Sequence, residues 1–331
     1  MDFPAFVPSS RNYNSGDYAV RTFRAQSGAE SRILYGDTRF GATLELQYQN
    51  VTDKNAQTFV GHYENVKGTY GTFTLPLRVI EGWDGSVRLL DRAYKNQRNT
   101  TATYTDQQGQ VQTAEPYETR FAYDENGNST GIFLEEEGVN LWRNSTNLTI
   151  GCQFWEKALT NEVTAPGNGL ATKYICVEFP LFLRQFFSPA PLPAGTYTAS
   201  IYIYVPTQEN VPNWVFVTDY NDANGQQTQP SEIFDRWVRV STTTTVPDST
   251  FIDFNTTIGG GLFPGYTFYA WGAQLEEGST FSSYIPSSGE ETRRAADKIV
   301  STGAWRYAEP PEITNVRPGI SNARVRLISV V

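Results

Sequence analysis

Aromatic side chains that lie close in sequence to amide and carboxylate groups form the most informative chemical pattern in this chain. Sugar-binding sites use such rings as platforms for the apolar face of a pyranose, while nearby polar groups bond the hydroxyls. The candidate platforms are Tyr202, Tyr204, Trp214 and Tyr220, with Asn213, Asp219, Asn221 and Asp222 as polar neighbours. Each ring could instead belong to the core or to an interface, and both interpretations stay open.

Two acidic clusters are the residues that could suggest hydrolysis. Glu135-Glu136-Glu137 and Glu276-Glu277 contain enough carboxylates for the paired acid and base of a glycoside hydrolase. That chemistry needs two carboxyl groups that face one cleft, whereas adjacent carboxylates on a strand alternate between its faces. We therefore favour a structural role for both clusters and keep a cell-surface glycan hydrolase as an alternative.

Histidine and cysteine chemistry has little support. The single histidine, His62, falls on a predicted helix without a nucleophile motif, so we expect it on the helix surface or at an interface. Cys152 and Cys176 lack the spacing of a zinc site and are expected to be buried thiols in a reducing cytoplasm. The glycine run 259–261 is not followed by the lysine of a nucleotide-binding loop. We expect no metal, no cofactor and no enzymatic activity.

The composition favours strands and argues against a nucleic-acid partner. The chain has 331 residues, enough for two buried domains, and contains 19 Tyr and 20 Phe, which suit pleated surfaces. Its formal net charge of −9 does not provide the clustered Lys and Arg that phosphate neutralisation requires. No apolar run approaches the length of a membrane span, and the first residues lack the pattern of a signal peptide. We expect a soluble protein made in the cytoplasm, without membrane insertion.

Residues 1–80 are predicted to form the first of two domains. Apolar and polar residues alternate from Phe40 to Tyr48, which predicts a strand with one buried face. Thr52 is a suitable N-cap for a helix whose apolar residues recur at helical spacing as far as Gly68. Residues 71–76 are expected to form a return strand that closes a small core.

A turn-rich connector over residues 81–105 is predicted to separate this domain from a second domain over residues 106–300. Short strands alternate with turn clusters in the second domain, as is typical of a sandwich or jelly roll. In its clearest strand, residues 197–205, alternate side chains should face the core, which leaves Tyr202 and Tyr204 on the other face. Residues 301–331 are expected to be a C-terminal tail that adds an edge strand or docks on a neighbouring subunit.

Two separated blocks of the second domain carry a recognisable signature. The later block contains Trp-Gly-Ala-Gln-Leu-Glu at 271–276, Ser-Tyr-Ile-Pro at 283–286 and Arg-Arg-Ala-Ala-Asp at 293–297, and the earlier block runs through 107–114, 120–124, 131–136 and 140–141. In order and spacing they resemble the carbohydrate-binding-module-like β-sandwich of bacteriophage tail-fibre and baseplate proteins. Where that family commonly has Arg-Thr before Asn-Leu, this chain has Gly138-Val139. The resemblance implies a sandwich in which Trp271 is structural.

The motif order in residues 1–80 matches a second pattern. Phe6-Val7-Pro8 is followed by Ser-Gly-Ala-Glu-Ser-Arg at 27–32, by the predicted strand and helix, and by the segment from Gly68 to Phe73. This order resembles the minor tail protein and distal tail protein families of the phage tail tip. The resemblance implies a tail-tip or adaptor domain that assembles into rings, with Phe3 and Phe6 as exposed apolar anchors for a neighbour.

These patterns predict an all-β fold of two β-sandwich domains, the N-terminal one with a single helix and the C-terminal one jelly-roll-like. The predicted protein is a non-enzymatic structural component of a bacteriophage virion, in the tail or baseplate. It should join other tail proteins through its N-terminal domain, form a homo-oligomer such as a ring or trimer, and present the sandwich to a host surface glycan. A head-decoration or fibre-anchor protein, whose sandwich only contacts virion proteins, is the alternative within the structural class.

Overall fold

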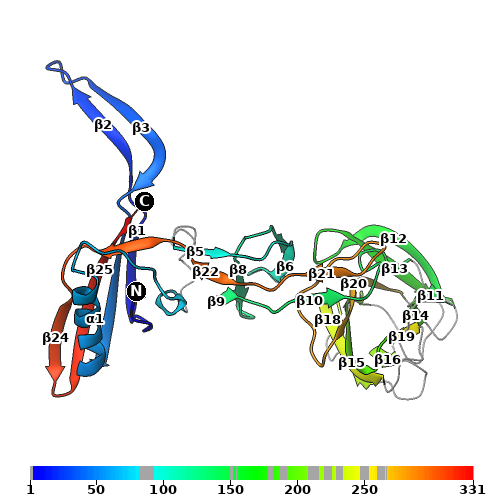
Figure 1. Cartoon of the computed structure of the whole chain (residues 1–331). Coiled ribbons are helices and arrows are strands. Elements are labelled where there is room, and N and C mark those ends of the chain that lie inside the picture. The colour runs from blue at the N-terminus through cyan, green and yellow to red at the C-terminus, as the bar shows by residue number, and fades with distance from the viewer. Residues whose placement is uncertain are drawn as a thin grey trace.

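The computed structural model shows an elongated molecule of three parts (Figure 1). A first domain carries a projecting hairpin, a narrow middle segment follows, and a sandwich forms the far end. The described residues are 3–81, 93–149, 152–153, 155–177, 182–186, 192–207, 216–219, 226–228, 234–246, 253–258, 265 and 267–330. The described strands are all paired antiparallel and the described part of the chain has one α-helix, so the all-β prediction with a single helix is confirmed.

The first domain is built on a five-stranded sheet that joins both ends of the described chain. Its strands are β1 (Ser10–Asn14), β4 (Thr43–Thr52), β25 (Ile320–Val330), β23 (Ala304–Tyr307) and β24 (Glu312–Arg317). The order is β1-β4-β25-β23, and β24 also pairs with β25. Residues 301–331 are therefore not a separate tail: they add β23 and β24 at one edge of this sheet, as expected for an added edge strand, and also β25. Their longest strand, β25, lies in the interior of the sheet, where it can bury the side chains Val325 and Leu327.

Helix α1 (Asp53–Asn65) packs on this sheet and confirms the prediction for residues 52–66. The Oγ1 of Thr52 accepts a hydrogen bond from the amide of Asn55 and so caps the helix. The helix buries Ala56, Phe59 and His62. The predicted return strand over residues 71–76 is reduced to a single bridge between Phe73 and Trp305, followed by the 3-10 helix η1 (Leu77–Val79).

An aromatic cluster fills the core between α1 and the sheet, and it corrects two predictions. Phe3 is only 2% exposed and its ring stacks on Phe73, so it is a core residue of its own chain rather than an exposed anchor. Phe6 is half-buried, with its ring edge-on to Phe59. His62 is also buried, with its Nδ1 2.9 Å from the hydroxyl of Tyr307, instead of lying on the helix surface.

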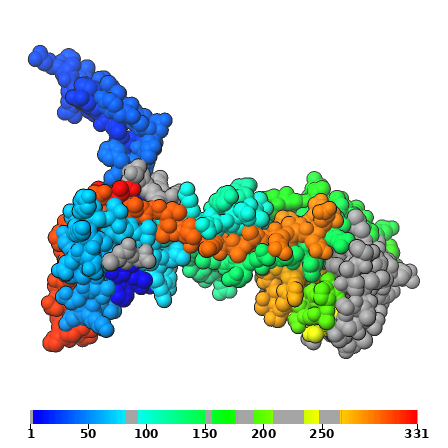
Figure 2. All heavy atoms as spheres, in the orientation of Figure 1, coloured from blue at the N-terminus to red at the C-terminus, as the bar shows by residue number. Residues whose placement is uncertain are grey.

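A two-stranded hairpin projects from the first domain, as Figures 1 and 2 show. We call it the arm; it consists of β2 (Asp17–Arg24) and β3 (Glu30–Phe40), which pair only with each other among the described strands. The predicted strand 40–48 is thus divided at Gly41: Leu44, Leu46 and Tyr48 are buried as expected, but Phe40 is 53% exposed. At the base of the arm, Gly16 has a φ of 75°, and a Cβ there would overlap the carbonyl oxygen of Phe40.

The middle segment consists of four short ladders. Two are hairpins within the outgoing part of the chain, and the other two pair the outgoing part with the returning part. The ladders are β5 (Tyr94–Asn96) with β22 (Ile299–Ser301), β6 (Ala102–Thr105) with β7 (Val111–Ala114), β8 (Arg120–Tyr123) with β9 (Ser129–Phe133), and β10 (Gly138–Asn140) with β21 (Thr292–Arg294). The predicted boundary at 105/106 therefore falls inside the β6–β7 hairpin. Part of the predicted second domain belongs to this middle segment.

The sandwich consists of two five-stranded sheets. The β15 sheet has the order β12 (Trp155–Thr164), β13 (Leu170–Cys176), β20 (Thr267–Glu277), β15 (Gly195–Tyr204) and β18 (Trp237–Val246). The second sheet has the order β11 (Cys152–Gln153), β14 (Phe182–Phe186), β19 (Asp253–Ile258), β16 (Phe216–Asp219) and β17 (Gln226–Thr228). The side chains of Cys152 and Cys176 lie outside the described residues.

The core of the sandwich follows the predicted alternation of β15. Tyr197, Ala199, Ile201 and Ile203, together with Val205, are all buried in one hydrophobic cluster, which confirms the expected inward face. Thr198 and Ser200 on the opposite face are buried as well, whereas Tyr202 and Tyr204 are half-buried. In the described part of the chain no helix is long and apolar enough to cross a membrane.

Candidate functional site

A row of three aromatic side chains crosses the outer face of the β15 sheet. Tyr204 on β15 is in register with Trp237 on β18 and with Tyr269 on β20. The ring centroids of Tyr204 and Trp237 are 5.7 Å apart, and those of Tyr204 and Tyr269 are 6.0 Å apart. Tyr204 and Trp237 are half-buried, so parts of their rings reach the surface. We call these three residues the aromatic row.

Polar groups surround the aromatic row. The indole Nε1 of Trp237 donates to the carbonyl oxygen of Thr164 at 2.8 Å, which fixes the ring. The hydroxyl of Tyr269 lies 2.9 Å from Glu162, which also pairs with Lys173 at 2.8 Å. Hydrogen bonds from Lys173 and Tyr269 lower the pKa of Glu162, so this carboxylate stays ionised beside the rings.

A groove of about 350 Å³ lies beside the aromatic row, between the sandwich and the middle segment. One part of its lining comes from the hairpins β6–β7 and β8–β9, which contribute Tyr104, Phe121 and Phe133. The other part comes from the outer face of the β15 sheet and the loop after β20, with Tyr202, Arg239 and Phe281. The groove therefore combines aromatic walls with hydroxyl groups, one arginine and one carboxylate, that of Glu135.

Arg239 and Tyr202 lie side by side in this groove because their positions on β18 and β15 are in register. The Arg239 guanidinium is 5.3 Å from the centroid of the Tyr202 ring and 4.3 Å from that of Phe281. Its Nη1 donates to the carbonyl oxygen of Ser282 and its Nη2 to the Oγ of Ser200. Burial raises the pKa of the Tyr202 phenol, so the ring remains neutral.

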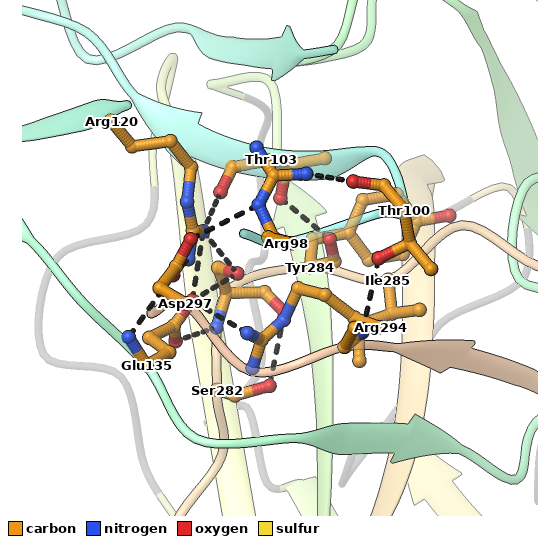
Figure 3. A network of polar contacts seen from close by, with 12 residues as sticks. Arg98, Thr100, Thr103, Arg120, Glu135, Ser282, Tyr284, Ile285, Arg294 and Asp297 are labelled. Carbon is orange, nitrogen blue, oxygen red and sulfur yellow. Dashed lines mark hydrogen bonds and ion pairs between the residues drawn. The ribbon is translucent and has the colours of Figure 1, made fainter. Parts of the chain in front are cut away.

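A buried polar network holds the middle segment together behind the groove (Figure 3). Asp297 pairs with Arg98 at 3.0 Å and with Arg120, and all three side chains are fully buried. Burial alone would raise the pKa of Asp297, but hydrogen bonds from Asn96 and Arg120 hold it below the ordinary value. Arg120 also binds Glu135 at 2.8 Å. The network joins segments that are far apart in the sequence.

One glutamate from each acidic cluster forms hydrogen bonds with residues next to this network. Glu135 accepts hydrogen bonds from the amide and hydroxyl of Ser283 at 2.7 and 2.6 Å. Glu276 accepts from the amide and hydroxyl of Ser282 at 2.8 and 2.7 Å. Both carboxylates thus hold the loop that follows β20. Glu136 and Glu137 are exposed.

The signature residues of the sandwich are likewise structural. The side-chain amide of Asn140 is fully buried; it donates to the carbonyl oxygens of Ala273 and Ile285 and accepts from the amides of Trp142 and Leu275. Trp271 is 5% exposed and packs on Tyr284. The space beside Gly138 holds the side chains of Ile285, Arg294 and Glu276.

The predicted sugar-binding residues are placed only in part. Tyr204 joins the aromatic row and Tyr202 lines the groove, whereas Trp214 and Tyr220 lie outside the described residues. Trp237 and Arg239 were missed as site residues. Their strand was recognisable in the sequence, but only its register with β15 reveals that they share a face with the two tyrosines.

No protein-family model matches the chain. No curated protein sequence matches it either. Among solved structures, the chain is similar to the N-terminal CBM22-1–GH10 modules of Clostridium thermocellum endo-1,4-β-D-xylanase 10B, solved with xylohexaose, with 11% identity, a TM-score of 0.32 and coverage of 46% of this chain and 30% of that one. This chain thus spans less than a third of that structure.

Two isolated modules are also similar. The C-terminal family 22 carbohydrate-binding module of Clostridium thermocellum xylanase 10B has 11% identity and a TM-score of 0.34, with coverage of 43% of this chain and 97% of the module. A carbohydrate-binding module of Cellvibrio mixtus lichenase 5A, solved with cellotriose, has 8% identity and a TM-score of 0.29, with coverage of 42% and 99%. The neighbours are carbohydrate-binding modules, and the likeness in fold is distant.

Proposed function

We propose that this chain is a non-enzymatic structural protein of a bacteriophage tail whose sandwich binds a glycan of the host surface. The observation that carries the glycan-binding part is the aromatic row with its polar border. Tyr204 and Trp237 offer ring surface on adjacent strands, the buried Tyr269 packs beside Tyr204, and Glu162 and Lys173 supply charged hydrogen-bonding groups at one end. Flat rings beside fixed polar groups are what pyranose recognition requires.

The environment of the carboxylates favours binding over hydrolysis. A glycoside hydrolase needs two carboxyl groups that are free to act on one bond. Glu135 and Glu276 are instead engaged by the serines of the loop after β20, and Glu135 also by Arg120. Their hydrogen bonds would have to be broken before either group could transfer a proton to a substrate.

The arm supports the virion part of the proposal and replaces Phe3 as the assembly contact. It exposes seven large apolar side chains, each between 39% and 63% accessible: Tyr18, Val20, Phe23, Ile33, Leu34, Tyr35 and Phe40. A two-stranded hairpin is marginally stable by itself in water, and contiguous exposed apolar surface marks an interaction site. The arm therefore has the properties of a segment that is completed by a neighbour.

The neighbour we propose for the arm is a second copy of this chain. Residues 17–40 carry four arginines and three acidic residues, a net charge of +1, so the remainder carries −10 of the total of −9. At close range, an arm that is slightly positive is attracted to the acidic remainder of another copy. Repetition of this contact would give a homo-oligomer and display several sandwiches together, which increases the avidity of a weak glycan site.

The glycan-binding part is tested by Trp237→Ala in the full chain. Truncation of an aromatic anchor costs about 2 kcal/mol, so retention on host cell-wall or capsular glycan should fall roughly thirtyfold. Tyr70→Ala is the matched control, because Tyr70 is 81% exposed on the first domain, far from the row. Near-UV circular dichroism and melting temperature verify that both variants fold. Unchanged glycan binding by a folded Trp237→Ala protein would refute this site.

A further inference from the structure

The buried charges behind the groove do not balance. Four arginines, Arg98, Arg120, Arg239 and Arg294, gather with three carboxylates, those of Asp297, Glu135 and Glu276. Each of these carboxylates accepts hydrogen bonds from neighbouring side chains or amides. The group therefore carries one positive charge in excess, although the whole chain has a net charge of −9. An uncompensated buried cation is costly unless an anion joins it.

Arg239 is the member of this group that lacks a carboxylate partner. Arg98 and Arg120 contact Asp297, and Arg294 lies 3.7 Å from Glu135. Among the described residues no carboxylate oxygen lies within 4 Å of Arg239. Its acceptors, the Ser282 carbonyl oxygen, the Ser200 hydroxyl and the Tyr202 hydroxyl, are neutral. Its Nε has no hydrogen-bond partner, and Glu276 and Glu135 attract it only from beyond ion-pair distance. Arg239 and Glu135 both line the groove, but the Glu135 carboxylate is already engaged by Arg120 and Ser283, whereas Arg239 has no carboxylate at ion-pair distance.

The groove offers more than a cation. Its volume of about 350 Å³ is at the lower end of the range for small-molecule sites, about 300–1,000 Å³. The rings of Tyr202 and Phe281 flank the guanidinium, so a ligand that reaches Arg239 also meets aromatic surface. An arginine guanidinium matches a planar anion such as a carboxylate.

We propose that this groove binds the carboxylate-bearing sugar residue of an acidic polysaccharide, with Arg239 facing the carboxylate. A uronate residue carries its charge on the ring itself, so one residue can meet both the guanidinium and the flanking aromatic rings. This inference rests on the proposed glycan-binding function and specifies its ligand class. It adds a subsite to the aromatic row, where Lys173 is paired with Glu162.

The test compares polygalacturonate with the same polymer after chemical reduction of its carboxyl groups. The full-length wild-type protein should bind polygalacturonate at least about tenfold more tightly, and added salt should weaken that preference because it screens the charges. Arg239→Gln should abolish the preference for the acidic polymer. Arg293→Gln is the matched control, because Arg293 loses the same charge from an exposed position paired with Glu137.

A second variant keeps the test decisive if Arg239→Gln does not fold. Phe281 is 40% exposed on the groove wall, so Phe281→Ala should weaken binding of polygalacturonate without disturbing the core. The wild-type comparison of the two polymers requires no variant at all. A folded Arg239→Gln protein that keeps the acidic preference would overturn the inference, as would a wild-type preference for a phosphate-bearing polymer such as teichoic acid over polygalacturonate.

The remaining outcomes separate this inference from the proposed function. Equal binding of the two polymers, with sensitivity to Trp237→Ala, would overturn the uronate subsite and leave glycan binding intact. Binding of no polymer on a broad array of neutral and acidic glycans, by a protein with an unchanged melting temperature, would overturn both.

Discussion

The Oε2 of Glu45 on β4 lies 2.9 Å from the Nη2 of Arg324 on β25. Arg326 approaches the same oxygen at 2.9 Å, so one carboxylate joins the N-terminal part of the first sheet to its C-terminal strand. Hydrogen bonds from Arg324 and Arg326 lower the pKa of Glu45 from its ordinary value of 4.5 to about 2. The stability of the first domain should therefore depend on pH through this group.

Because the folded-state pKa is the lower one, Glu45 contributes stability above pH 4.5 and loses that contribution as the pH falls towards about 2. Glu45→Gln removes the titrating group. The difference in melting temperature between wild type and Glu45→Gln should accordingly shrink as the pH is lowered from 5 to 2. Calorimetric scans across this interval measure it, and a difference that stays constant would contradict the role given to Glu45.

Asp297→Asn should be among the most destabilising single changes in the chain. The substitution keeps the shape of the side chain but leaves Arg98 and Arg120 buried without their shared carboxylate. Loss of one partner of a buried ion pair typically costs about 3–5 kcal/mol. Urea denaturation gives the value.

Glu81→Gln is the control for this measurement, because the Arg78–Glu81 pair is more than half exposed on both sides. An exposed pair contributes at most about 1 kcal/mol. Equal effects of Asp297→Asn and Glu81→Gln would show that the buried network is not what stabilises the middle segment.

Asn140→Asp tests how much the side-chain hydrogen bonds of Asn140 stabilise the sandwich. The wild-type amide donates to the carbonyl oxygens of Ala273 and Ile285, and an ionised aspartate would place negative charge against both. Each buried group left unsatisfied costs about 1–3 kcal/mol, so a loss of several kcal/mol is expected. Asn144→Asp is the matched control because Asn144 accepts a hydrogen bond from Gly289 near the surface, which aspartate preserves. If chemical denaturation shows similar losses in the free energy of unfolding for the two variants, the hydrogen bonds of Asn140 do not have this stabilising role.

The arm can be removed without disturbing the sheet that bears it. Replacement of residues 17–40 by a two-residue turn keeps the β1–β4 ladder, which ends at the pair Asn14 and Thr43. We expect the variant to fold, to remain monomeric in sedimentation experiments at concentrations where wild type associates, and to be absent from purified particles.

Point substitutions separate loss of the arm from loss of its apolar surface. Val20→Ser with Leu34→Ser removes one cross-strand apolar pair but retains the hairpin, and it should weaken association in part. Normal incorporation of the protein that lacks residues 17–40 would disprove the assembly role of the arm.

Local signals in the sequence predicted local structure well. The Thr52 cap gave the start of α1, and strict alternation gave the buried face of β15, because these features depend on neighbours within a few residues. Non-local pairing was not predictable from such signals. Nothing in the periodicity of β25 indicates that it pairs with β4, or that Phe3 fills the core beside Phe73.

The site was predicted in the same uneven way. The outward position of Tyr202 and Tyr204 followed from alternation along one strand. Arg239 could not be recognised, because its importance depends on a register with β15 and on the surplus of positive charge that three other arginines create. The residues of this charged group lie between positions 98 and 297 in the sequence, and only folding brings them together.

The position of β25 in the first sheet has a consequence for the order in which the molecule is made. A ribosome releases β1, β4 and the arm early, but the strand that lies against β4 emerges only after the whole sandwich. Until then one edge of β4 lacks the strand that pairs with it, whereas the sandwich can already fold from its own strands. A chain interrupted before residue 320 would keep a folded sandwich, but its first sheet would lack β25. The first domain, from which the arm projects, can therefore be completed only after β25 has been synthesised.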